Sequence, residues 1–67
     1  MKGFITTIEL NVTTNASFKE QTIKQSFRGF DYTQETSLRQ AERHAEEYLN
    51  NKYILGYEID NIRIESI

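Results

Sequence analysis

The sequence predicts a small α+β fold in the order β-β-α-β, a three-stranded antiparallel sheet covered on one face by a single helix. Two observations predict it. Residues 33–50 have apolar side chains at the spacing of one helical face, and the segments on either side alternate with a period of two and are rich in β-branched and aromatic residues. A helix with one apolar stripe needs an apolar surface to cover, so we expect it to pack on the sheet.

The first two strands are expected at residues 4–12 and 18–30. The first alternates apolar or threonine side chains on one face with a more polar second face, and its apolar content favours the centre of the sheet. Residues 13–17 form a polar turn in which Asn15 can adopt a left-handed conformation. The second strand is more polar, which favours an edge. A phase change between Ile23 and Phe27 on one side and Phe18 and Phe30 on the other predicts a bulge or two short pieces.

The helix is expected over residues 33–50, with Thr33 as the N-cap and Asn50 near the end. Glu35 then lies in the first turn and forms an i, i+4 pair with Arg39. The stripe that faces the sheet consists of Leu38, Ala41, Ala45, Tyr48 and Leu49.

The last β region, residues 52–67, changes phase at Asp60-Asn61. A single strand from about residue 57 to 65 with a bulge there explains the change, and so does a tight hairpin turn. We favour the bulged strand, because each hairpin arm would be short. Pairing of this strand with the first gives the order 2-1-3. The predicted core comprises Phe4, Ile8, Leu10, Ile23, Phe27, Leu38, Ala41, Ala45, Leu49, Tyr57 and Ile59.

Composition limits the class of protein. The chain has 67 residues, which predicts one domain, and with no cysteine it has neither disulfides nor thiolate metal ligands. A domain this small is marginally stable, so we expect a homo-oligomer, most simply a homodimer. No run of apolar residues is long enough for a membrane span, and the first residues lack the pattern of a secretory signal, which predicts a cytoplasmic protein without membrane contact.

The residues that carry catalysis in other proteins are sparse. His44 is the single histidine, and with Glu47 it supplies at most two metal ligands. No nucleophile–base arrangement or phosphate-binding glycine loop is present. We therefore expect no enzymatic activity, no cofactor and no metal.

Protein binding is the favoured function. The face of the sheet without the helix is expected to expose Ile5 and Thr7, with Ile62 or Ile64 beside them, as an apolar contact surface. Free strand edges offer a second route. The acidic helix surface with Glu42, Glu46 and Glu47 offers a third.

Nucleic-acid binding is the alternative. Lys19, Lys24 and Arg28 alternate with phenylalanines along the second strand, as on sheets that stack nucleic-acid bases. The net charge of −2 and the pI of about 5.3 weigh against it.

In its size and β-β-α-β order the chain resembles short reading frames of bacteriophages and other mobile elements. Such proteins often act as small inhibitors or regulators. The resemblance implies an accessory protein that regulates a partner.

Overall fold

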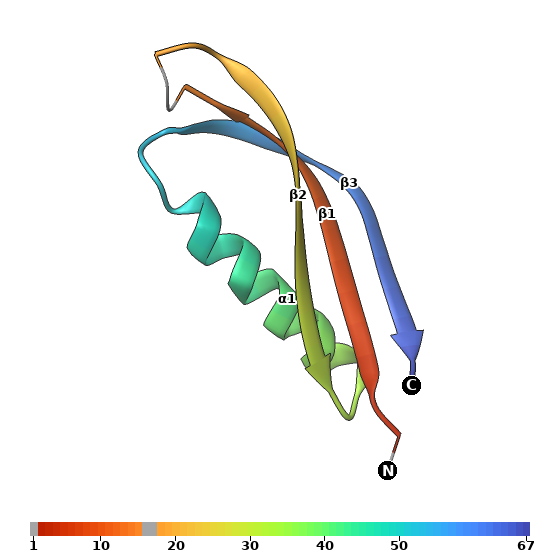
Figure 1. Ribbon diagram of the computed structural model, residues 1–67. Coiled ribbons are helices and arrows are strands. Elements are labelled where there is room, and N and C mark those ends of the chain that lie inside the picture. The colour runs from red at the N-terminus through yellow and green to blue at the C-terminus, as the bar shows by residue number, and fades with distance from the viewer. Residues whose placement is uncertain (1, 16–17) are drawn as a thin grey trace.

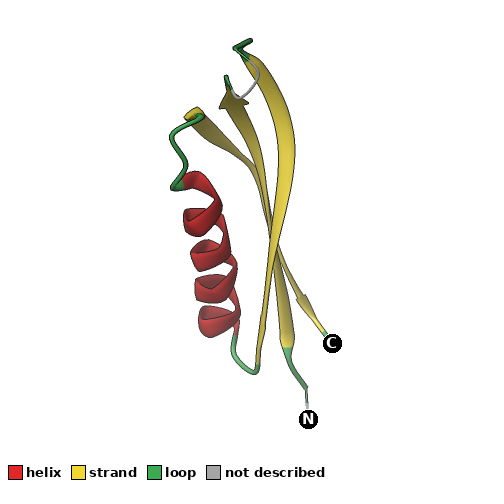
Figure 2. Ribbon diagram, turned by 60° about the vertical axis from the view of Figure 1, so that its left-hand side comes forward, coloured by secondary structure: helices red, strands yellow, loops and turns green. Residues whose placement is uncertain are grey.

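A computed structural model describes residues 2–15 and 18–67 of the chain. The elements are β1 (Phe4–Thr14), β2 (Gln21–Asp31), α1 (Gln34–Leu49) and β3 (Ile54–Ser66) (Figure 1). The strands form one antiparallel sheet of order β2-β1-β3, and α1 lies against one of its faces (Figure 2). The predicted α+β fold and strand order are confirmed.

Helix α1 begins and ends where its capping residues predict. The Thr33 side chain accepts a hydrogen bond from the Thr36 backbone N–H at 3.2 Å, and the Asn50 N–H donates to the Glu46 carbonyl. Arg39 donates to Glu35 at 2.8 Å, as the i, i+4 spacing predicts.

Strands β1 and β3 are longer than the sequence pattern predicts, whereas β2 is shorter. β1 and β2 have 11 residues each and β3 has 13, which corresponds to about 36–43 Å, whereas the 16 residues of α1 span about 24 Å. The molecule is therefore elongated, 47 Å along its long axis. The connected ends of β1 and β2 extend beyond the C-terminal end of α1 (Figures 1 and 2).

The pairing of β1 with β2 runs without a break from Phe4↔Asp31 to Thr14↔Gln21. The predicted bulge in the second strand is therefore wrong. Phe18 lies before β2 begins, and so it does not belong to the alternation of the strand. Phe18 also has the left-handed backbone, with φ of 59°, that the sequence assigned to Asn15. Residues 16 and 17 of the predicted turn lie outside the described residues.

Strand β3 is one bulged strand, as predicted. Its register against β1 shifts between Glu9↔Asn61 and Leu10↔Ile59, which leaves Asp60 as the extra residue. The bulge brings Ile62 onto the same face of the sheet as Ile59. A second shift, unpredicted, leaves Leu55 unpaired near the start of the strand.

The core lies between α1 and the two strands β1 and β2. Its buried apolar residues are Ile8, Leu10, Val12, Ala41 and Ala45, and the partly buried residues packed around them are Ile23, Phe27, Leu38, Tyr48, Leu49 and Ile54. Of the predicted core, Phe4 is only half-buried, and Tyr57 and Ile59 are exposed. Val12, which is fully buried, was missing from the prediction.

Small residues let α1 approach β2 closely. A Cβ atom on Gly29 would lie 2.3 Å from the Ser37 carbonyl oxygen and 2.5 Å from the Ala41 nitrogen. Beside this contact the hydroxyls of Thr6 and Ser37, both fully buried, form a hydrogen bond. The first half of α1 is thus held near the end of β2 by a glycine, an alanine and a hydroxyl pair.

Candidate functional site

Helix α1 is displaced toward the β2 edge of the sheet. His44 Nδ1 lies 2.6 Å from the Arg28 carbonyl oxygen, and the Phe30 N–H donates to Gln40 Oε1 at 3.1 Å. These side chains satisfy backbone groups on the outer edge of β2. With Gly29 also close to the helix, α1 packs on β2 and β1 and has little contact with β3.

The displacement leaves the apolar side chains of β3 uncovered. Directly paired residues share a face of the sheet, so the partners of the buried β1 side chains lie on the same face as α1. These β3 residues are Tyr57, Ile59, Ile62 and Ile64, which are 54 %, 60 %, 44 % and 39 % exposed. They form a continuous apolar row beside the helix.

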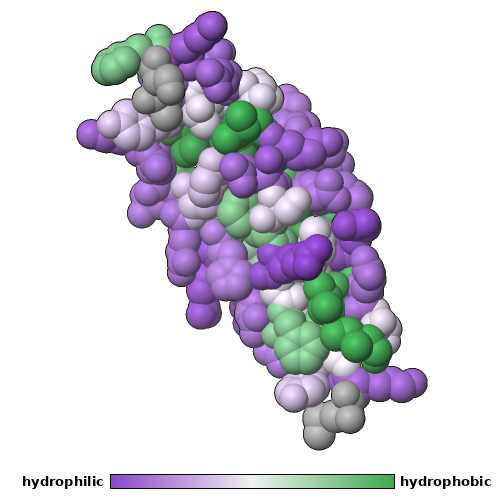
Figure 3. Space-filling model, viewed as in Figure 1, coloured by the Kyte–Doolittle hydropathy of each residue, from purple (hydrophilic) through white to green (hydrophobic). Residues whose placement is uncertain are grey.

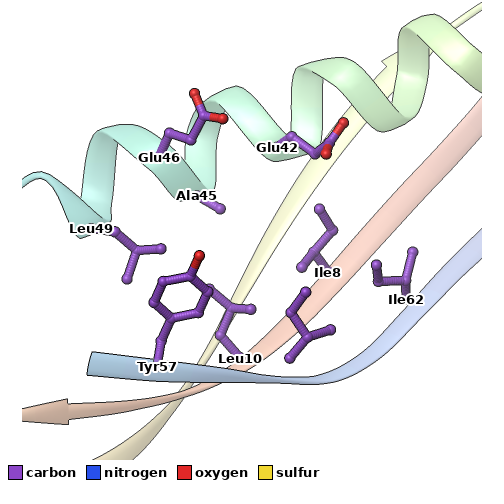
Figure 4. A pocket seen from close by; sticks show the side chains of 9 residues that line it. Ile8, Leu10, Glu42, Ala45, Glu46, Leu49, Tyr57 and Ile62 are labelled. Carbon is purple, nitrogen blue, oxygen red and sulfur yellow. The ribbon is translucent and has the colours of Figure 1, made fainter.

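A groove runs between this row and α1. It is lined by Ile8 and Leu10 of β1, by Glu42, Ala45, Glu46 and Leu49 of α1, and by Tyr57, Ile59 and Ile62 of β3. We call it the α1–β3 groove. Figure 4 shows Glu42 and Glu46 on the helix above an apolar floor. Its hollow measures about 120 Å³, well below the roughly 300–1,000 Å³ of sites that enclose a small molecule. Its shape suits inserted side chains of a larger partner.

The helix side of the groove is acidic. Glu35, Glu42 and Glu46 recur at the spacing of one helical flank. Only Glu35 has an ion-pair partner, Arg39, among the residues that the structure describes. Glu46 lies near the C-terminal, negative end of the helix dipole, where a carboxylate is unfavourable. The last turn of α1 has no basic residue that would offset this charge.

The opposite face of the sheet is mostly polar, but it also carries Ile5 paired with Phe30, which is 45 % exposed, and a contact through Ile5 and Thr7 stays a prediction. In Figure 1 the sheet lies in front of α1, and the same view in Figure 3 is largely hydrophilic with scattered apolar patches. Thr7 is only 5 % exposed, and Ile5 is half-buried. Ile62 and Ile64 lie on the helix face instead, because the bulge at Asp60 reverses the alternation.

Ion pairs cross the polar face. Lys24 lies 3.4 Å from Asp60, and Arg63 lies 3.6 Å from Glu9. Each pair links two different strands. Positive and negative side chains are therefore mixed on this face. The surface therefore has no uniform sign that would attract one class of charged partner.

Only part of the predicted acidic helix surface borders the α1–β3 groove. Glu42 and Glu46 line the α1–β3 groove. Glu47 is exposed and lies outside the groove. The structure thus brings two of the three predicted acidic residues together.

Of the predicted nucleic-acid residues, Lys24 and Arg28 share a face of β2 with Phe30 but not with Phe27. Lys19 precedes β2, while Lys24 and Arg28 alternate with the row of β2 that faces the helix. Phe27 is in that row and packs against Tyr48 of α1, with ring centroids 5.3 Å apart. Phe30, which is 45 % exposed, lies on the same face as Lys24 and Arg28. One aromatic side chain of β2 is therefore beside the basic residues and the other packs on the helix, and nucleic-acid binding stays a prediction.

The strand edges differ from each other. The β2 edge is partly occupied by His44 and Gln40. β3 is the other edge strand, and its two bulges interrupt the regular backbone pattern that an added strand needs.

In the described part of the chain, no three His, Asp or Glu side chains gather as metal ligands, and no helix is long and apolar enough to cross a membrane. His44, the residue considered for a metal, contacts the Arg28 carbonyl instead.

The groove residues of β3 escaped the sequence prediction. Tyr57 and Ile59 were assigned to the core and Ile62 and Ile64 to the opposite face, because the alternation was read separately on each side of Asp60. One available signal was the width of the sheet. Strands lie about 4.8 Å apart and packed helices 8–10 Å apart, so one helix covers about two strands. In a three-stranded sheet the third strand is then left uncovered.

Comparisons of the chain with protein-family models, curated proteins and solved structures gave no match.

Proposed function

We propose that this chain is a non-enzymatic protein-binding module that receives its partner in the α1–β3 groove. The observation that carries the proposal is the exposed apolar row of Tyr57, Ile59, Ile62 and Ile64 beside the helix. Contiguous apolar surface on a small domain marks a contact site more often than an isolated exposed side chain does.

The energetics favour a large partner. Burying the exposed halves of four such side chains would contribute about 3–6 kcal/mol, from 1.5–3 kcal/mol for each fully buried side chain. Association costs about 4–15 kcal/mol in lost freedom of motion. The apolar row alone therefore only approaches the cost of association, and a partner must also contact the helix side of the groove.

Both a second copy of the chain and a different protein satisfy this requirement. A homodimer through the groove would give a domain of this size the additional buried surface that it lacks. A different protein would make the chain a cytoplasmic regulator of that partner, the role that its resemblance to small proteins of mobile elements implies.

Photo-crosslinking from the groove tests the proposal. We expect benzoylphenylalanine in place of Tyr57 to give covalent protein adducts when the variant is expressed in its native cells and irradiated. The control is benzoylphenylalanine in place of Tyr32, which lies at the β2–α1 corner outside the groove and is 56 % exposed, against 54 % for Tyr57. Gels and mass spectrometry identify the adducts.

Adducts from position 57 but not from position 32 support a protein-binding groove. An adduct between two copies of this chain identifies a homodimer, and any other adduct identifies a different protein. No adduct from position 57, or the same adducts from both positions, contradicts the proposal.

A second expected result separates binding from folding. Ile59→Thr should change the free energy of unfolding by less than about 1 kcal/mol, because the side chain is 60 % exposed and threonine suits a strand. The same substitution at Ile8, which lies in the adjacent strand β1 and is 4 % exposed, should cost about 2 kcal/mol or more. Urea denaturation followed by circular dichroism measures both. A large loss for Ile59→Thr would show that β3 belongs to the core of the isolated chain.

A further inference from the structure

The uncovered part of the sheet has the length and width that a second helix would cover. From Tyr57 to Ile64 the apolar row extends about 23 Å along β3, which is the length of a helix of about 16 residues. A second helix packed 8–10 Å from α1 would be displaced by about two strand spacings. Because α1 lies over β2 and β1, that helix would lie over β3.

The acidic flank of α1 favours a positively charged flank on such a helix. Glu42 and Glu46 are one turn apart and both exposed, and in the described residues neither has an ion-pair partner. Like charges at this spacing destabilise a helix by about 0.2–0.5 kcal/mol. Their place near the C-terminal end of α1 adds an unfavourable interaction with the helix dipole. Lysine or arginine from a partner would relieve both effects.

The same charges disfavour a second copy as the occupant. If two copies joined their β3 edges about a two-fold axis perpendicular to the sheet, both helices would lie on the same face. The flank of α1 that faces the groove would then point toward the same flank of the other helix. Glu42 and Glu46 of each copy would then face acidic residues, and like charges across an interface are unfavourable.

We propose that the α1–β3 groove binds an amphipathic helix of another protein, with an apolar stripe on the β3 row and lysine or arginine on the flank that faces Glu42 and Glu46. This inference rests on the proposed protein-binding function and adds the structure and charge of the partner. The partner helix completes a second layer over the sheet, with α1 on β2 and β1 and the added helix on β3.

Three designed peptides of about 18 residues test the inference. All have leucine at i, i+3, i+4 and i+7 spacing, and the flanking positions are lysine in the first, glutamine in the second and glutamate in the third. Fluorescence anisotropy at physiological salt measures the affinity of each labelled peptide for the full chain. We expect the lysine peptide to bind at least about five-fold more tightly than the glutamine peptide, as two exposed ion pairs imply, and the glutamate peptide most weakly.

Variants of the chain locate the site. Glu42→Gln with Glu46→Gln should weaken binding of the lysine peptide about five-fold and leave the glutamine peptide unchanged. The control, Glu47→Gln with Glu58→Gln, makes the same change in net charge at exposed positions outside the groove and should leave both affinities unchanged. Ile59→Thr should weaken binding of both peptides, because it removes part of the apolar floor.

Four results would overturn the inference. Equal losses in the two double variants would show attraction to the overall negative charge. Equal affinities of the three peptides, or no binding, would show that the groove does not select a basic helix. A dimer in sedimentation that Ile59→Thr dissociates would identify a second copy as the occupant. The photo-crosslinks from position 57 are independent of the peptides, so the proposed function can stand when the inference fails.

Discussion

Replacing Gly29 with alanine is expected to lower the free energy of unfolding by about 3 kcal/mol or more. The added Cβ would lie 2.3 Å from the Ser37 carbonyl oxygen and 2.5 Å from the Ala41 nitrogen. Both atoms belong to the backbone of α1, so no change of rotamer can relieve the overlap. The helix must move away from β2, which also separates the Thr6 and Ser37 hydroxyls. Urea denaturation measures the loss.

Gly56→Ala is the matched control. No atom lies within 4 Å of a Cβ at Gly56, and its φ is not positive. Alanine should therefore leave stability unchanged or raise it by up to about 1 kcal/mol, because glycine loses more conformational freedom on folding. Similar stabilities of the two variants would contradict the close approach of α1 to β2.

Replacing Leu10 with alanine is expected to cost about 2–5 kcal/mol. Leu10 is 2 % exposed in the central strand, and it lies between the core and the floor of the α1–β3 groove. Truncation removes buried apolar surface and leaves a cavity that three strands and one helix can only partly close. The thermal midpoint and the urea midpoint should both fall.

The control is Leu55→Ala. Leu55 is 55 % exposed and is the unpaired residue of the second bulge in β3. Its truncation should change the free energy of unfolding by no more than about 0.5 kcal/mol. Equal losses at Leu10 and Leu55 would mean that the core is not centred on β1.

These expectations together describe a domain whose stability lies in α1, β1 and β2. The apolar residues of β3 contribute cross-strand pairing but remain open to solvent on the helix face. Substitutions in the α1–β3 groove can therefore change binding while the chain keeps its fold, which makes the groove accessible to mutational tests.

Local patterns in the sequence determined the elements and their order. Alternation in residues 4–12 identified β1, the apolar stripe and Thr33 identified α1, and the phase change at Asp60-Asn61 identified the bulge in β3. These features depend on neighbours within a few residues, so period and capping are sufficient to predict them. The order 2-1-3 followed from placing the most apolar strand at the centre.

The tertiary structure alone decided where the helix lies on the sheet, and with it the candidate site. Gly29 permits the close approach to β2, and His44 and Gln40 hold α1 at the β2 edge through contacts with backbone atoms. None of these contacts has a periodic signature, because each joins residues that are distant in sequence. For that reason the sequence predicted Tyr57 and Ile59 as core, whereas the position of α1 leaves them in an exposed groove.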